Sequence, residues 1–133
     1  MTIFEKILAG DVPSYKVAEN EKCLAFLDVF PLKEGHVLVI PKSPIDYIFD
    51  IDNQDLSDLH LFSKKVAIAM KSVLSCNRIG LAVIGLEVPH AHIHLVPIDS
   101  VEDINFSKPK IEVDSNRMLE ISLAISQAFQ KLD

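Results

Sequence analysis

The sequence predicts a single α+β domain, an antiparallel sheet of about five strands with two main helices packed against it. Three observations lead to this prediction. At 133 residues the chain is long enough to bury one core and too short to divide into two. Short apolar runs bounded by turn residues alternate with two long segments of helical periodicity. Between residues 90 and 94, three histidines alternate with apolar residues, which is the period of a β-strand.

The first part of the chain predicts a short helix followed by three strands. Residues 3–10 carry apolar side chains at helical spacing, and Gly10 ends that helix. The polar turn 19–22 separates two apolar runs and predicts a hairpin. The strands expected in this part are residues 15–19, 23–28 and 36–40, the last closed by Pro41.

Two long helices and two more strands are expected after it. A helix that begins with Asp52 as N-cap and runs to about Ser75 has one apolar stripe, formed by Leu59, Phe62, Val66, Met70 and Val73. A last helix near residues 114–132 buries Met118, Ile121, Ile125, Phe129 and Leu132. Between the helices, strand 78–84 and the histidine segment are joined by a short connection and are expected to be antiparallel neighbours.

Composition narrows the class of function. The chain has 13 Lys and Arg against 19 Asp and Glu, a net charge of −6, which argues against a nucleic-acid partner. No apolar run is long enough to span a membrane, and the start of the chain lacks the apolar stretch of a signal peptide, so we expect no membrane partner and a cytoplasmic protein. Cys23 and Cys76 are expected to be free thiols because they form no paired-cysteine motif.

The most informative segment is Pro89–Pro97, in which His90, His92 and His94 alternate with apolar residues. On a β-strand this period of two places the imidazoles on one face and the aliphatic side chains on the other. Alternate residues lie roughly 6.5–7 Å apart on a strand, so three rings can converge on one phosphate or one metal ion. A strand that carries histidine by chance is the simpler alternative, but the clustering of a scarce residue argues against it.

Two chemistries use such a row. Three neutral imidazoles can bind Zn²⁺ and leave a fourth position for water. Alternatively, one imidazole attacks phosphorus and forms a covalent intermediate while its neighbours hold the phosphate oxygens and transfer a proton to the leaving group. His92 is the natural nucleophile because it has an imidazole on each side. The sequence has no His-Glu-x-x-His motif, no dense acidic cluster near the row and no cysteine pair, which favours phosphorus chemistry.

The segment His90–Val96 matches the pattern His-φ-His-φ-His-φ-φ, where φ is apolar, and so resembles the histidine triad (HIT) family of nucleotide hydrolases and transferases. Residues 3–17 look like the amino-terminal segment of the family's HINT-like hydrolase branch, 24–28 like its ribose-binding strand and 35–42 like its next strand. The resemblance implies a HIT-like fold in one domain over residues 1–133, a homodimer, and a nucleotide substrate, most simply a purine nucleotide.

Carried over to matching positions, the resemblance also implies roles for four histidines. His92 would form a nucleotidyl-histidine intermediate, and His94 would contact the α-phosphate and serve proton transfer. His90 would support the row from behind, and His36 would add a further imidazole nearby. By contrast, His60 on the long helix is expected to be a surface side chain.

The same resemblance implies a nucleotide-binding set. Asp28 matches the residue that accepts hydrogen bonds from the ribose hydroxyls. Apolar residues expected around the base, for which plain core packing is the alternative, are Ile3, Phe4, Ile7, Phe26, Leu27 and Val29. Gly85 could let the backbone approach a phosphate, although an ordinary turn explains it equally well.

The sequence departs from the family in two places. Where many members have a Cys-x-x-Cys pair and a histidine that hold a structural zinc, this chain has Thr2, Glu5 and Pro44, so we expect no metal and no other cofactor. The loop before the triad is shorter than usual and contains Glu87, whose charge opposes an anionic substrate unless it points away or pairs with a cation.

These residues predict a nucleotide hydrolase or nucleotidyl transferase that releases a nucleoside 5′-phosphate from an amine, acyl or phosphate leaving group. Three alternatives stay open at this point. They are a dinucleoside polyphosphate hydrolase, a nucleotide-binding module with weak or no catalysis, and a metal-dependent hydrolase that uses the three histidines as ligands.

Overall fold

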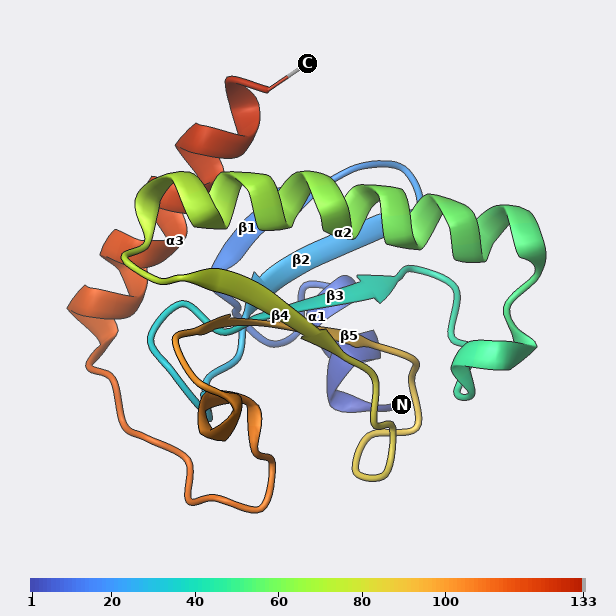
Figure 1. Cartoon of the computed structure of the whole chain (residues 1–133). Helices are drawn as coiled ribbons and strands as arrows, with labels where there is room; N and C mark the ends of the chain where they lie inside the picture. The colour runs from blue at the N-terminus through green and yellow to red at the C-terminus, as the bar shows by residue number, and fades with distance from the viewer. Residues whose placement is uncertain (133) are drawn as a thin grey trace.

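A five-stranded antiparallel sheet forms the centre of the protein (Figure 1). The structure, a computed structural model, describes residues 1–132. In chain order the elements are α1 Ile3–Leu8, β1 Lys16–Glu19, β2 Cys23–Leu27, β3 Val37–Pro41, the 3₁₀-helix η1 Ile48–Asp50, α2 Asn53–Val73, β4 Arg78–Ala82, β5 Ile93–Ile98, the 3₁₀-helix η2 Val101–Ile104 and α3 Ser115–Gln130. The predicted α+β class is confirmed.

The strand order β1-β2-β3-β5-β4 decides what lies next to the histidines. The β1–β2 hairpin and the antiparallel β4–β5 pair confirm the predicted neighbours. Because β5 is inserted between β3 and β4, His94 pairs with Leu38 of β3, which in turn pairs with Phe26 of β2. Residues from three segments far apart in the sequence therefore meet in one row across the sheet.

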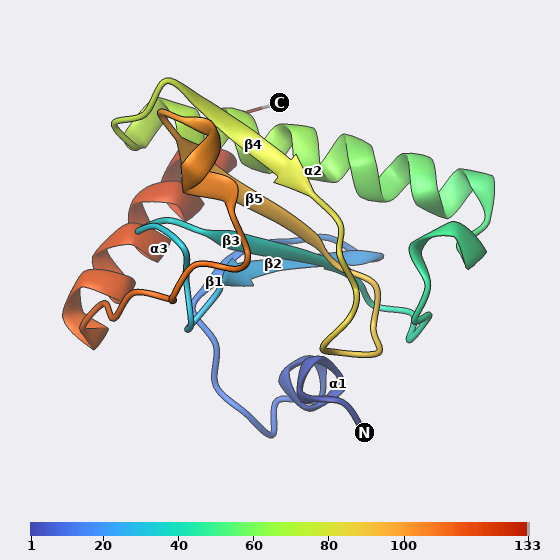
Figure 2. The same ribbon diagram turned by 60° about the horizontal axis from the view of Figure 1, so that its bottom comes forward.

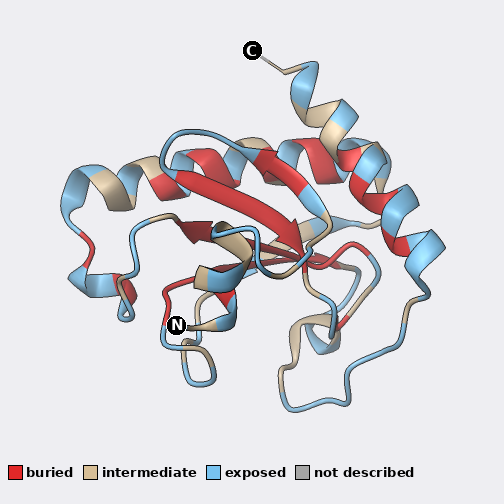
Figure 3. Cartoon of the chain, turned by 180° about the vertical axis from the view of Figure 1, so that it is seen from behind, coloured by how far each residue is buried: buried red, intermediate tan, exposed pale blue. Residues whose placement is uncertain are grey.

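Helices cover the two faces of the sheet unequally. The long helices α2 and α3 cover one face, and α1 lies on the opposite face beside the loop that joins β4 to β5 (Figure 2). Since side chains alternate along a strand, β2 sends Ala25 and Leu27 into the core under α2 and α3, and Phe26 into a smaller cluster with Phe4 of α1. Both β2 and β3 are buried along their whole length for this reason (Figure 3).

The long helices follow their predicted stripes with one correction. Asp52 caps α2 by accepting a hydrogen bond from the Asp55 N–H. Val73, expected in the core, is 42% exposed because the helix ends there and the next residue, Leu74, packs against the core instead. In α3 the residues Met118, Ile121 and Ile125 are buried, while Phe129 and Leu132 are partly buried against the same core.

The histidine segment is only partly a strand. Strand β5 begins at Ile93, so His94 lies on the sheet while His90 and His92 precede it, and β4 ends at Ala82 rather than residue 84. The prediction of one regular strand over the whole row is wrong because residues 90–92 have other backbone partners: Ala91 N–H donates to Ile45 O. No helix within residues 1–132 is both long and apolar enough to cross a membrane.

Candidate active site

The three triad histidines are buried side by side on the face of the sheet that α1 covers. The rings of His92 and His94 have centroids 4.9 Å apart, and the ring of Phe4 stands edge-on to both His90 (5.8 Å) and His92 (5.0 Å). Helix α1 is short, so a reciprocal capping box between Thr2 and Glu5 holds its first turn and with it Phe4. Figure 2 shows α1 in this position beside the β4–β5 loop.

Hydrogen bonds assign the proton on His92. Its Nδ1 lies 2.7 Å from the His90 carbonyl oxygen, which can only accept, so Nδ1 carries the proton. In the neutral ring Nε2 then keeps its lone pair and is free to act as a nucleophile. Burial, the largest cause, lowers the pKa of His92, which keeps the ring neutral near pH 7.

A second assignment links His36 to His94. The Leu32 N–H donates to His36 Nδ1 at 3.0 Å, so the neutral His36 ring carries its proton on Nε2. That Nε2 lies 3.0 Å from His94 Nδ1 and donates to it, which leaves the His94 proton on Nε2. The row therefore places a nucleophilic nitrogen on His92 next to a hydrogen-bond donor on His94.

Both members of this pair are held neutral. Burial lowers the pKa of His36 to about 3 and of His94 to about 4, and the neighbouring imidazole lowers each further. His90 is also fully buried, with Nε2 donating to the Pro41 carbonyl oxygen at 2.8 Å. Its Nδ1 is a buried atom without a hydrogen-bond partner among the described residues.

The predicted carboxylate lies at the His36 end of the row. Asp28 Oδ2 is 3.7 Å from His36 Nε2, and the Asp28 N–H donates to the His36 carbonyl oxygen at 2.9 Å. The turn that brings the two residues together uses Gly35, which has φ +90° and whose missing Cβ would lie 2.7 Å from a Leu74 methyl carbon. Burial raises the pKa of Asp28, and the hydrogen bond from the Phe30 N–H opposes that rise.

The apolar residues predicted around the base separate into three groups. Phe4 and Phe26 are buried together, with ring centroids 5.7 Å apart, and Ile7 packs partly buried against them. Leu27 points to the opposite face and belongs to the main core, so the structure does not bring it to the histidines. Ile3 and Val29 are 45% and 55% exposed and do not belong to the buried cluster.

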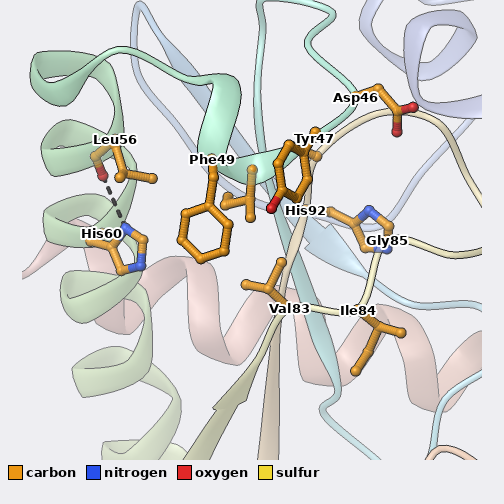
Figure 4. A pocket seen from close by; sticks show the side chains of 11 residues that line it. Asp46, Tyr47, Phe49, Leu56, His60, Val83, Ile84, Gly85 and His92 are labelled. Carbon is orange, nitrogen blue, oxygen red and sulfur yellow. Dashed lines mark hydrogen bonds between the residues drawn. The ribbon is translucent and has the colours of Figure 1, made fainter.

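A pocket of about 440 Å³ lies between His92, the η1 region, α2 and the segment after β4 (Figure 4). Gly85, at φ +76° in the connection from β4 to β5, lines one end of it, and His60 lines the opposite end. The rings of Tyr47 and Phe49 lie between these two histidines in the view of Figure 4. His60 is exposed as predicted, and its Nδ1 donates to the Leu56 carbonyl oxygen.

Sequence reasoning missed two parts of the site. Phe106 packs on His94, with centroids 4.6 Å apart, and Lys110 lies over the Phe106 ring. Both residues come from the loop between η2 and α3, which has no periodic pattern to place it. The only available signal is the run Lys108-Pro109-Lys110, a cationic stretch in an acidic chain.

The donor atoms of Asp28, His36 and His94 lie within 4.8 Å of one another and form a candidate metal-binding group. The proton on His36 argues against that use, because Nδ1 already accepts from Leu32 and Nε2 would have to lose its proton to bind a cation. A structural zinc at the amino terminus does not fit either, since the polar side chains of Thr2 and Glu5 are used in the capping box and Pro44 has no ligand atom.

Comparison with known proteins defines the family. Residues 9–101 match the family model of the HIT domain, and the chain belongs to the HIT family. It is 39% identical over 99 residues to the adenosine 5′-monophosphoramidase HNT1 of Saccharomyces cerevisiae, covering 71% of this chain and 61% of that protein. An uncharacterized HIT-like protein of Borreliella burgdorferi is 33% identical over 132 residues, covering 93% and 95% of the two chains.

Solved structures agree with the fold. A zinc-bound histidine triad family protein from Mycobacterium smegmatis has a TM-score of 0.83 at 26% identity, covering 98% of this chain and 94% of that chain. A hypothetical histidine triad nucleotide-binding protein from Sulfolobus tokodaii also has a TM-score of 0.83 at 26% identity, covering 98% of this chain and 93% of that chain. The predicted HIT-like fold is therefore confirmed, and the relatives support a nucleotide hydrolase.

Proposed function

We propose that this protein is a hydrolase of nucleoside 5′-phosphoramidates and related nucleotides, working through a nucleotidyl intermediate on His92. The hydrogen bond from His92 Nδ1 to the His90 carbonyl oxygen carries the proposal, because it leaves Nε2 unprotonated. The adjacent His94 offers an N–H donor for a phosphate oxygen, in agreement with its expected contact to the α-phosphate. The name of the yeast relative supports an amine leaving group.

The chemistry proceeds in two displacements. The lone pair of His92 Nε2 attacks the α-phosphorus, the bond to the leaving group breaks, and the leaving amine takes up a proton. Water then attacks phosphorus and gives a proton back to His94, the P–Nε2 bond breaks, and the nucleoside monophosphate leaves. An incoming phosphate favours the protonated form of an adjacent imidazole, so the pKa of His94 rises from about 4 when substrate binds and His94 can supply the proton.

The nucleotide lies along the row in this proposal. The ribose hydroxyls bind Asp28, and the base, proposed as a purine, packs near the apolar cluster of Phe4 and Phe26, against which Ile7 lies partly buried. The leaving group points away from His92 Nε2, as in-line displacement requires. Gly85 and the pocket of Figure 4 lie on the other flank of His92.

The test is hydrolysis of adenosine 5′-phosphoramidate in excess EDTA by the wild type, by His92→Ala and by Lys64→Ala, an exposed substitution on α2. We expect turnover by the wild type and Lys64→Ala but not by His92→Ala. Intact-protein mass spectrometry of quenched reactions should detect a nucleotidyl adduct that is absent in His92→Ala. Turnover that persists in His92→Ala would refute the proposal.

The same assay separates the alternatives. Activity abolished by EDTA and restored by Zn²⁺ would indicate the metal-dependent hydrolase. Faster turnover of a diadenosine polyphosphate than of the phosphoramidate would indicate a dinucleoside polyphosphate hydrolase. Binding of adenosine monophosphate without any turnover would indicate a nucleotide-binding module, with the short loop containing Glu87 as its cause.

The proposed assembly is a homodimer in a reducing compartment, the cytoplasm. Strand β4 is at the edge of the sheet and exposes Leu81, followed by the exposed Ile84 and Leu86. An apolar edge strand of this kind favours pairing with a second copy. Cys23 and Cys76 are free thiols, which is typical of a reducing compartment. Light scattering on the purified protein tests the dimer, and a monomer mass would refute it.

A further inference from the structure

The loop over residues 105–110 crosses the His36–His94 pair and is fixed at both ends. A turn with Lys108 N–H donating to Asn105 O begins it, and the N–H of Ile111 donates to Pro31 O at 2.9 Å, in the loop that follows Asp28. Within it the Phe106 ring stands edge-on to His94 at 4.6 Å and to His36 at 6.3 Å between centroids. The loop is thus one wall of the site.

This wall places the positive charge of the Lys110 side chain at the site. Lys110 Nζ lies 5.3 Å from the centre of the Phe106 ring, on the ring that contacts both histidines. Lys110 has no ion pair with a carboxylate within residues 1–132, whereas the nearby Lys108 pairs with Glu102 at 3.2 Å. Its charge acts on the site, since Lys110 lowers the pKa of Asp28, His36 and His94.

An anionic ligand needs such a cation here. Burial lowers the pKa of His36, His92 and His94 and keeps them neutral, so they bring hydrogen bonds but no positive charge. The two acidic groups that act on the site, Asp28 and Glu87, oppose a phosphate, as does the net charge of −6. A flexible lysine side chain supported on an aromatic ring can reach a phosphate oxygen without moving the backbone.

We propose that Lys110, held over Phe106 above the His36–His94 pair, binds the phosphate of the nucleotide and makes the site selective for anionic nucleotides over uncharged nucleosides. This inference rests on the proposed function because it requires a nucleotide at the histidine row. Lys110 acts as a binding residue, and Phe106 is a positioning residue that supports its side chain.

The test is calorimetric titration of the purified protein with adenosine monophosphate and, separately, with adenosine. Lys110→Gln should weaken adenosine monophosphate binding about fivefold to tenfold and leave adenosine binding unchanged. Lys110→Arg should restore most of the lost affinity. The matched control, Lys108→Gln, removes a cation two residues away and should change neither affinity, because Lys108 is engaged with Glu102.

The salt dependence of the affinity is a second measurement, and a purely structural role of Lys110 would not change it. Affinity of the wild type for adenosine monophosphate should fall with added NaCl more steeply than that of Lys110→Gln. The inference would be overturned if Lys110→Gln and the wild type had equal affinities for adenosine monophosphate, or if the variant lost affinity equally for both ligands. Wild-type turnover would not be affected by either result, so the proposed function would stand. A wild type that binds neither ligand would overturn the proposed function, and the inference with it.

Discussion

Lowering the pH should destabilise the protein through His36, and the structure gives the size of the effect. His36 is buried and neutral with a pKa of about 3 in the folded state, against 6.5 for an ordinary histidine. Between these two values the unfolded chain binds a proton that the folded chain does not, so stability is complete above about pH 6.5 and is lost as the pH falls. From about pH 7 to about pH 5, linkage gives a loss of about 2 kcal/mol from this one group.

The perturbation that isolates this contribution is His36→Gln. A glutamine amide can still donate to His94 Nδ1 but does not titrate, so the variant should lose about 2 kcal/mol less than the wild type over the same pH interval. Urea unfolding at a series of pH values measures both slopes, and His60→Asn, which changes an exposed histidine, should keep the wild-type slope. If the free energy of unfolding that His36→Gln loses between about pH 7 and about pH 5 is within about 0.5 kcal/mol of the wild-type loss, the assignment of His36 as a buried neutral base is refuted.

Three further outcomes are expected. Asp28→Asn should weaken adenosine binding by about 1–2 kcal/mol but leave 2′,3′-dideoxyadenosine unaffected, and calorimetry of both ligands would expose a merely structural effect as an equal loss. Glu87→Gln should strengthen adenosine monophosphate binding by about twofold, since it removes a negative charge that acts on Asp28 and His92, and an unchanged dissociation constant contradicts this. Leu59→Ala, at a fully buried position of α2, should cost about 2–5 kcal/mol in urea unfolding, whereas Leu61→Ala, at a 62% exposed position, should cost less than about 0.5 kcal/mol; similar losses would show the apolar stripe to be misplaced.

The individual strands and α-helices could be predicted from the sequence because each has a local signal, whereas the insertion of β5 between β3 and β4 has none. Strands β2 and β3 are apolar runs bounded by turns, and Asp52 is both an N-cap residue in the pattern and the N-cap in the structure. The end of α2 could not be placed, because Val73 and Leu74 are both apolar and tertiary packing selects Leu74. Periodicity also overextended the histidine strand, since nothing local reveals the bond from Ala91 N–H to Ile45 O.

The site was predictable only as a set of residues. Spacing identified the triad, and the family resemblance added His36 and Asp28, which the structure places 3.7 Å apart between Nε2 and Oδ2. The resemblance did not distinguish Phe26 from Leu27, because it matched the whole segment at once. A period of two puts these neighbouring residues on opposite faces of the sheet, and only Phe26 lies on the face of the histidines. The cationic run Lys108-Pro109-Lys110 is the only sequence signal for the Phe106–Lys110 wall, and it does not place the wall at the site, because that position depends on where an irregular loop folds back.

The chemistry assigned to each histidine depends on backbone groups rather than on neighbouring charges. Leu32 N–H fixes the proton of His36 on Nε2, and through it that of His94; the His90 carbonyl oxygen fixes the proton of His92 on Nδ1. Backbone groups do not titrate, so the identity of the nucleophilic nitrogen is constant over the pH range in which the fold is stable. Acid should therefore abolish activity by protonating and loosening the buried pair, in parallel with the loss of stability, and not by exchanging the roles of His92 and His94.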